Sequence, residues 1–197
     1  MTLLKFLILF ILFITGCQPP MAHHESTGGL VICFGDSLTA GYGAAKGHDY
    51  PSYLRAKVKS RVFNLGMRGD NSNSALSRLE SDVLMFNPKL VIITMGANDY
   101  MTGTPKERVL ANMMKIIERI KARGATVVWA EVQMGALSDP YIPDFRALAD
   151  YEHILLIPNI LGGIIDHPEY KHDPIHPNDE GYKIMADRIY QKIKGLL

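Results

Sequence analysis

A chain of 197 residues that is 47% hydrophobic and 21% charged has the composition of a globular protein, which excludes a wholly disordered one. Its 21 Lys and Arg side chains are balanced by 20 Asp and Glu, for a formal net charge of +1. The overall charge therefore gives no reason to expect nucleic acid as a partner, and the length fits one compact domain.

The N-terminal segment has the layout of a secretory signal peptide. Residues 6–14 are an unbroken apolar run after Lys5, and this run is about half as long as a helix that spans a membrane. Residues 14–17, Ile-Thr-Gly-Cys, resemble the bacterial lipobox, in which the cysteine carries the lipid and becomes the new N-terminus. The resemblance implies a lipoprotein signal peptide over residues 1–16 and lipidation of Cys17. An uncleaved anchor and an ordinary signal peptide are the alternatives, and both also place the domain outside the cytoplasm.

Residues 17–29 follow as a tether between the lipid and a domain over residues 30–197. The segment contains two prolines and two glycines and shows no hydrophobic period. Gln18 stands after the lipobox cysteine, where an aspartate would resemble an inner-membrane retention signal. We therefore expect an exported, membrane-anchored lipoprotein of the bacterial cell envelope, sorted to the outer membrane. Cys33 lies inside an apolar run and is expected to be a buried thiol without a disulfide partner.

Five short apolar runs within the domain are predicted to be strands. They are rich in Val and Ile and show no alternation of apolar and polar residues, which is typical of parallel strands covered on both faces. The runs span residues 30–34, 62–65, 90–95, 126–132 and 154–157.

Longer amphipathic segments lie between and after these runs and are predicted to be helices. They span residues 51–60, 73–86, 105–123, 143–151 and 178–194, and Gly124 ends the longest of them. Strands that alternate with helices form right-handed crossovers and a parallel sheet with helices on both faces. The predicted fold is a three-layer α/β/α sandwich with a five-stranded parallel sheet. In such sheets ligands bind at the carboxyl ends of the strands.

The first strand is followed by Gly35-Asp36-Ser37-Leu38, which places a serine at a strand-to-helix turn. Thr39 stands where the second glycine of a G-x-S-x-G nucleophile elbow would be, so the sequence argues against the α/β-hydrolase fold. Taken alone, this short motif is equally typical of a turn with a helix N-cap.

Three further motifs follow in order along the chain. Gly69-Asp70 comes after the second strand, Gly96-Ala97-Asn98-Asp99 after the third, and Asp173-Pro174-Ile175-His176 near the C-terminus. Together with the serine motif they resemble the GDSL or SGNH hydrolase family over nearly all of residues 30–193. The resemblance implies the flavodoxin-like SGNH-hydrolase fold and a serine esterase that needs no cofactor or metal. Within this family, the serine motif and Gly96-Ala97-Asn98-Asp99 resemble those of the bacterial branch with thioesterase, lysophospholipase and arylesterase activities.

Residue by residue, the resemblance makes Ser37 the nucleophile and Asp173 and His176 the rest of a catalytic triad. It also implies an oxyanion hole from Ser37, Gly69 and Asn98. A serine hydroxyl needs a base to take its proton, imidazole can do so near neutral pH, and an acid three residues before it can hold the ring. Gly66 competes with Gly69 for the second position, and the Gly69-Asp70 match favours Gly69.

Several residues near these motifs have plainer interpretations. Asp36 and Asp99 are expected to bond local backbone and to take no chemical step. Residues 166–176 are dense in possible metal ligands, but the triad already explains Asp173 and His176, so no metal site is expected. Apolar residues after the fourth predicted strand either wall an acyl pocket or pack in the core. They are Met134, Leu137, Tyr141, Ile142 and Phe145.

The sequence therefore predicts a monomeric esterase that cuts carboxylic esters or thioesters of small molecules or lipids through an acyl-enzyme. An O-deacetylase of envelope carbohydrate, which uses the same fold and catalytic set, is the alternative enzyme. A non-catalytic surface lipoprotein that keeps the fold for binding is the alternative outside the enzymes.

Overall fold

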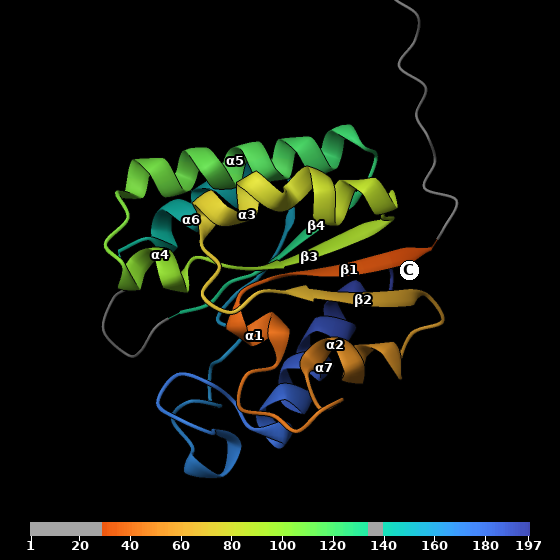
Figure 1. Ribbon diagram of the computed structural model, residues 1–197, viewed down its shortest axis with the longest axis vertical. Helices are drawn as coiled ribbons and strands as arrows, with labels where there is room; N and C mark the ends of the chain where they lie inside the picture. The colour runs from red at the N-terminus through yellow and green to blue at the C-terminus, as the bar shows by residue number, and fades with distance from the viewer. Residues whose placement is uncertain (1–28, 134–139) are drawn as a thin grey trace, which may run out of the picture.

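Five parallel strands form one sheet in the order β2-β1-β3-β4-β5 in the computed structural model, which describes residues 29–133 and 140–197 (Figure 1). The strands are β1 (Leu30–Gly35), β2 (Arg61–Gly66), β3 (Leu90–Thr94), β4 (Thr126–Ala130) and β5 (Leu155–Ile157). All neighbouring pairs are parallel. This strand order is that of the flavodoxin-like folds, so the predicted fold class is confirmed.

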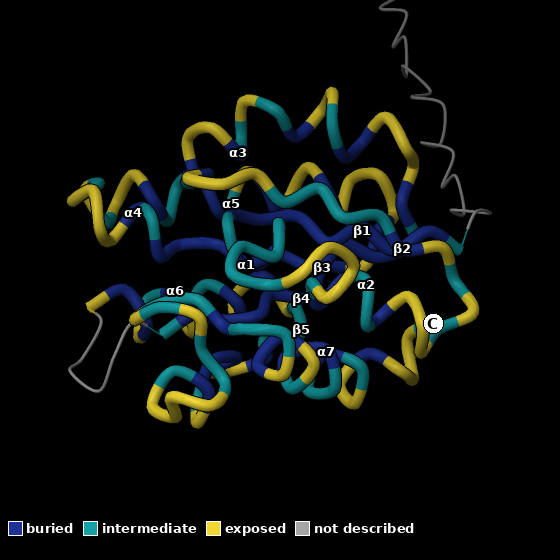
Figure 2. Tube along the Cα trace, turned by 60° about the horizontal axis from the view of Figure 1, so that its bottom comes forward, coloured by how far each residue is buried: buried dark blue, intermediate teal, exposed yellow. Residues whose placement is uncertain are grey.

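Burial separates the central strands from the edge strands (Figure 2). Every residue of β1 and β3 is buried, whereas β2 and β5 at the two edges keep several half-buried residues. Along β1, Ile32 and Phe34 contribute to the hydrophobic core on one face of the sheet, and Val31 and Cys33 to the core on the other. This is why the central runs are apolar throughout: both of their faces are covered.

Helices cover both faces of the sheet and complete the three layers (Figure 1). One face carries α3 (Ser72–Arg78), α5 (Lys106–Ala122) and α6 (Ile142–Tyr151), and the other carries α2 (Tyr50–Arg55) and α7 (Asp179–Ile193). The stripe on α5 packs Val109, Met113, Ile116, Ile117 and Ile120 into the core. At the start of α7, the Asn178 side chain accepts a hydrogen bond from the Gly181 N–H at 3.1 Å.

The short elements differ from the sequence prediction. The helix predicted over residues 51–60 ends at Arg55, and the one predicted over 73–86 continues beyond α3 as a π-helical turn (Leu79–Val83) and a 3-10 turn (Leu84–Phe86). Two helices of a single turn or little more, α1 (Ser37–Ala40) and α4 (Ala97–Met101), begin just after β1 and β3. They were not predicted, because helices this short show no hydrophobic period.

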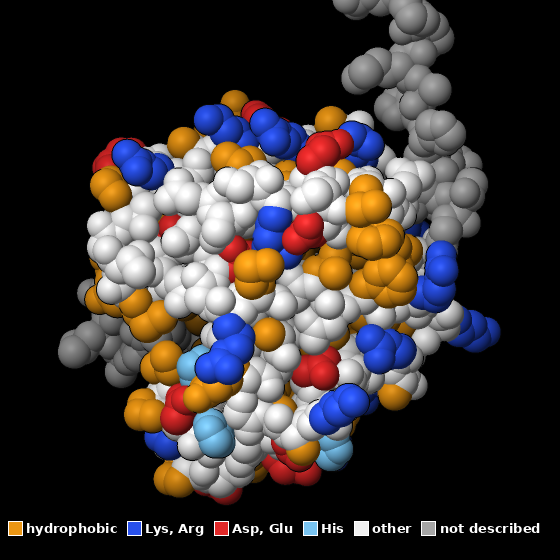
Figure 3. Space-filling view, viewed as in Figure 1, with side chains coloured by type: hydrophobic (Ala, Val, Ile, Leu, Met, Phe, Trp, Pro, Cys, Tyr) orange, Lys and Arg blue, Asp and Glu red, His pale blue; other side chains and the backbone are white. Residues whose placement is uncertain are grey.

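Within the described residues, no helix is both long and apolar enough to cross a membrane. The predicted signal peptide, Cys17 and all of the predicted tether but Gly29 lie outside those residues. On the face drawn in Figure 3, basic and acidic side chains are interspersed, as expected from a formal net charge of +1.

Candidate active site

Ser37 is held at the carboxyl end of the central strand β1, where α1 begins. Asp36 caps this helix, because its Oδ1 accepts the N–H of Leu38 at 2.9 Å. Gly35 lies so close to β3 that a side chain there would meet the Thr94 carbonyl oxygen at 2.2 Å. The strand order reverses direction between β1 and β3, and ligands of such sheets bind at this point. The first motif therefore fixes a serine at the expected binding edge.

The side chains of Ser37, His176 and Asp173, from the two ends of the domain sequence, contact one another there in succession. The Ser37 Oγ lies 2.9 Å from Nε2 of His176, although the two residues are 139 positions apart. On the other side of the imidazole, Nδ1 lies 2.8 Å from Oδ2 of Asp173. With the proton on Nδ1, as this contact requires, Nε2 is free to accept the hydroxyl proton of Ser37.

The loop that carries Asp173 and His176 is organised around the aspartate. Its Oδ1 accepts the backbone N–H groups of Ile175 and His176, each at 2.9 Å. Partial burial raises the pKa of Asp173, but these N–H groups and the His176 ring lower it more, so the net pKa lies below its ordinary value. Asp173 is therefore anionic at neutral pH.

Hydrogen-bond donors line the opposite wall, beside Ser37. Gly69 has a φ of +78°, in the left-handed region that favours glycine, and it lines the cleft together with Asn98 and Ser37. Within the described residues, the backbone N–H groups of Ser37 and Gly69 donate to no other group. The Asn98 side chain is oriented by a hydrogen bond from Nδ2 to the Asp70 carbonyl oxygen at 2.8 Å.

Gly66, the competing glycine, has a different place. It is the last residue of β2 and pairs with Gly35, and a side chain there would come within 2.1 Å of the Ala40 nitrogen. Gly66 therefore allows β2 to approach α1, while Gly69 lies in the cleft.

The cleft in front of Ser37 has a volume of about 420 Å³. Besides the residues above, its walls contain Tyr42, Arg68, Met101 and Ile175. Of the two roles expected for the apolar residues after the fourth strand, the described ones have the packing role. Tyr141, Ile142 and Phe145 are buried in the core, whereas Met134 and Leu137 lie outside the described residues.

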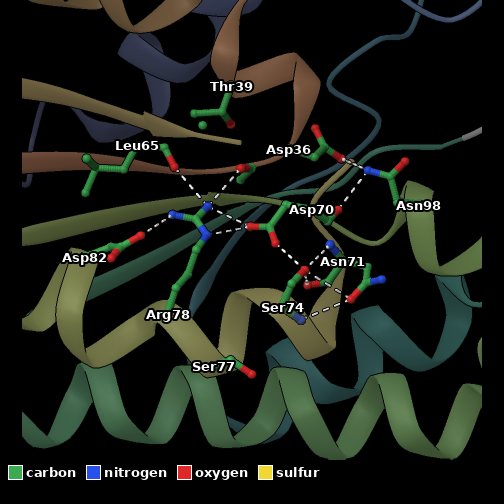
Figure 4. Close-up of polar contacts among 12 residues, drawn as sticks. Asp36, Thr39, Leu65, Asp70, Asn71, Ser74, Ser77, Arg78, Asp82 and Asn98 are labelled. Carbon is green, nitrogen blue, oxygen red and sulfur yellow. Dashed lines mark hydrogen bonds and ion pairs between the residues drawn. The ribbon is translucent and has the colours of Figure 1, made fainter. Parts of the chain in front are cut away.

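A buried ion pair behind the donor wall was not foreseen from the sequence (Figure 4). Arg78 donates from Nε and Nη2 to Oδ2 of Asp70, at 2.9 and 2.6 Å. The same Nη2 also donates to the backbone carbonyls of Gly35 and Leu65, at 3.2 and 3.0 Å. The Asp70 side chain is fully buried. The Arg78 guanidinium thus links the ends of β1 and β2 to the loop that contains Gly69 and Asp70. The Asp70 carbonyl in turn accepts the hydrogen bond from Asn98.

A second buried link joins α3 to α4. The Asp99 carboxylate accepts the backbone N–H of Ser72 at 2.8 Å and its hydroxyl at 2.7 Å, and Asn112 donates to the same hydroxyl at 3.1 Å. The prediction of a local backbone partner is confirmed for Asp36 and wrong for Asp99, whose partner lies 27 residues away.

Burial raises the pKa of Asp36 to about 7, helped by the carboxylates of Asp70 and Asp99 and opposed by the Leu38 N–H. Burial also raises the pKa of Asp99.

Comparisons with known proteins agree with this geometry. The model of the GDSL-like lipase/acylhydrolase family matches residues 33–184. An arylesterase of Vibrio mimicus is 30% identical over 174 residues, which cover 83% of this chain and 87% of that protein. Thioesterase 1/protease 1/lysophospholipase L1 of Escherichia coli (strain K12) is 25% identical over 175 residues, which cover 85% of this chain and 84% of that protein. The crystal structure of TesA superposes with a TM-score of 0.79 at 26% identity, covering 85% of this chain and 99% of that one.

Proposed function

The chain belongs to the GDSL-like lipase/acylhydrolase family and is a serine esterase, and we propose that it cuts its substrate through an acyl-enzyme on Ser37. The observation that carries this proposal is the 2.9 Å contact between the Ser37 Oγ and Nε2 of His176, with Asp173 on Nδ1. A serine aligned with a base that is itself held by an acid is the arrangement that activates a hydroxyl as nucleophile.

The reaction proceeds in two halves that use the same groups. The Ser37 Oγ bonds to the carbonyl carbon while His176 takes the hydroxyl proton, which forms a tetrahedral oxyanion. When the bond to the leaving oxygen or sulfur breaks, His176 returns the proton to that atom, and the acyl group remains on Ser37. Water then attacks the acyl-enzyme with His176 as base, and the carboxylic acid leaves as the serine is regenerated. Asp173 stabilises the imidazolium in both halves.

The oxyanion is stabilised by the donors on the opposite wall. We assign this role to the N–H groups of Ser37 and Gly69 and to the amide of Asn98, which lie together in the cleft. Donors that are fixed in place before the reaction are worth about 3 to 4 kcal/mol each in the transition state. The hydrogen bond from Asn98 to the Asp70 carbonyl supplies that fixation for the amide.

We further propose that the enzyme is an exported lipoprotein. Residues 1–16 would be removed, Cys17 would carry the lipid, residues 17–29 would form the tether, and residues 30–197 the esterase domain. The position of Gly29 supports this organisation, because it precedes β1 at the amino ends of the strands, whereas Ser37 lies at their carboxyl ends. Gly29 and Ser37 thus lie at opposite ends of β1.

The test is hydrolysis of 4-nitrophenyl esters from acetate to palmitate by the full chain in detergent, with Ser37→Ala as the control. We expect turnover to fall about 10⁶-fold in the variant, as for other serine nucleophiles, with an unchanged melting temperature. Activity confined to acetate would favour the carbohydrate O-deacetylase instead. Activity that survives in Ser37→Ala would exclude this serine as the nucleophile.

A further inference from the structure

Arg68 is a cation at the mouth of the catalytic cleft and has no ionic partner within the described residues. Its guanidinium lies over the ring of Tyr42, with 4.0 Å between Cζ and the ring centroid, and the residue is exposed. In residues 29–133 and 140–197 it forms no ion pair and donates no hydrogen bond to another side chain. The face of the guanidinium stacks on Tyr42, whereas its N–H groups have no partner in the part of the chain that the structure describes.

Three carboxylates that line the cleft or adjoin residues that line it already have other partners. Asp70 is buried against Arg78, and Asp173 is bonded to His176 and to its own loop. Asp99 is bonded to Ser72. Among the described residues Arg68 therefore forms no ion pair with a carboxylate, although Asp173 lines the same cleft.

The position of Arg68 relative to the catalytic groups indicates which part of a substrate it meets. The Tyr42 ring packs edge-on against His176, with centroids 4.6 Å apart, so that Arg68, Tyr42 and His176 form one wall. His176 protonates the leaving group, which must therefore depart along this wall.

A narrow recess of about 10 Å³ next to Ser37 is lined by neither Arg68 nor Tyr42, although His176, Asn98 and Asp36 line it. Apolar side chains line much of it: Leu38, Ala97, Met101 and Ile175. The Arg68 guanidinium therefore belongs to the main cleft and not to this recess, whereas Met101 and Ile175 line both.

We propose that Arg68 binds an anionic group, a phosphate or a carboxylate, on the leaving group of the ester. The proposal rests on the proposed function, because it takes Ser37 and His176 as the reacting groups. A guanidinium presents parallel N–H donors that match the oxygens of both anions, and stacking on Tyr42 holds it in place before the substrate arrives. The preferred substrates are therefore esters with a negatively charged leaving group.

The test compares esters that share the butyryl group and differ in leaving-group charge. The probes are 4-(butyryloxy)benzoate and 4-(butyryloxy)phenyl phosphate, each measured against the neutral methyl 4-(butyryloxy)benzoate. For the full chain we expect Arg68→Gln to lower the charged-to-neutral ratio of kcat/KM about tenfold, as for a charge-assisted hydrogen bond at a partly exposed site. Arg68→Lys should retain most of the ratio, and added salt should lower it in the wild type.

Arg123→Gln is the matched control, because Arg123 is an exposed arginine at the end of α5 that pairs with Glu80. It should leave the ratio unchanged. A drop for the carboxylate, the phosphate or both probes in Arg68→Gln supports the proposal and identifies the anion. An equal ratio in Arg68→Gln and wild type for both probes overturns it, even if the neutral ester is hydrolysed as the proposed function requires.

A further pair of probes places the charge on the acyl side. If Arg68→Gln lowers the preference for mono-4-nitrophenyl succinate over 4-nitrophenyl butyrate and spares the leaving-group ratios, the assignment to the leaving group is wrong. If the wild type hydrolyses none of these esters, the proposed function fails, and the role of Arg68 fails with it.

Discussion

Two groups of polar residues meet at the carboxyl ends of the strands, and they are built in opposite ways. The reacting residues Ser37, Asp173 and His176 lie on loop ends, and the side chains of His176 and Asp173 are 13% and 29% exposed. The supporting residues Asp70 and Arg78 lie behind the wall of the cleft, and the Asp70 side chain is 0% exposed. The first group has to be reached by substrate, whereas the second only has to hold backbone in place. Changes in the first should therefore cost turnover, and changes in the second should cost stability as well.

After Ser37→Ala, the largest effect is expected from Asp173→Asn, in the reacting group. An amide oxygen can still accept the N–H groups of Ile175 and His176, so the loop should keep its shape. The imidazole, however, loses the anion that fixes its tautomer and stabilises its charged form, and kcat should fall about 10⁴-fold. Steady-state kinetics and thermal unfolding check this together. A loss of less than tenfold would mean that Asp173 does not orient His176.

The next effect belongs to the supporting group. Arg78→Met leaves the Asp70 carboxylate buried without its counter-ion and frees the carbonyls of Gly35 and Leu65. The free energy of unfolding should fall by about 3 to 5 kcal/mol, measured by urea denaturation. The double variant Asp70→Asn/Arg78→Met removes both charges and should recover part of this loss. If Arg78→Met costs less than about 1 kcal/mol, the ion pair is not the support described here.

Asn98 lies where the two groups meet, because its amide is held by the Asp70 carbonyl and faces the cleft. Asn98→Ala should lower kcat by about 10² to 10³, since one oxyanion donor is lost in the transition state. KM should change little, because the amide stabilises the carbonyl of the bound ester less than it stabilises the oxyanion of the transition state. A loss in kcat below about threefold would show that the amide points elsewhere.

The smallest effect concerns Asp36, which is buried next to Ser37 and whose pKa is raised from 3.8 to about 7. A folded-state pKa above the unfolded value means that this contribution to stability is fully present at low pH and is lost as the pH rises through about 7. Asp36→Ser keeps an N-cap acceptor for the Leu38 N–H but cannot ionise. The melting temperature of wild type minus that of the variant should therefore be larger at pH 5 than at pH 8. A difference that is constant or grows with pH contradicts the burial argument.

The fold was predictable from sequence because its signals are long or repeated. Runs of Val and Ile identified all five strands, and the apolar stripe of α5 with Gly124 after it identified the longest helix. The turns at Ser37–Ala40 and Ala97–Met101 were not predicted, since four or five residues cannot show a helical period. The π-helical turn at Leu79–Val83 was also missed, because its composition is that of an ordinary helix.

The site was predictable only where its residues fall in short motifs. Ser37, Gly69, Asn98, Asp173 and His176 follow strands or precede the last helix in recognisable groups, and the structure brings all five to one cleft. Arg78 has no such signal. It lies at the end of α3, eight residues after Asp70. Two of its partners are backbone carbonyls of β1 and β2, and no pattern of side chains in the sequence indicates such contacts. The pairing of Asp99 with Ser72 was missed because the two residues lie 27 positions apart, on different helices, and no local pattern joins them.

The central claim is that Ser37 is activated by His176, and covalent labelling tests it most directly. The full chain is incubated with a fluorophosphonate, and the modified residue is located by mass spectrometry of peptides. A single adduct on Ser37, absent from Ser37→Ala and formed far more slowly in His176→Ala, is the predicted result. An adduct on a different residue, or equal labelling of His176→Ala and wild type, would contradict it.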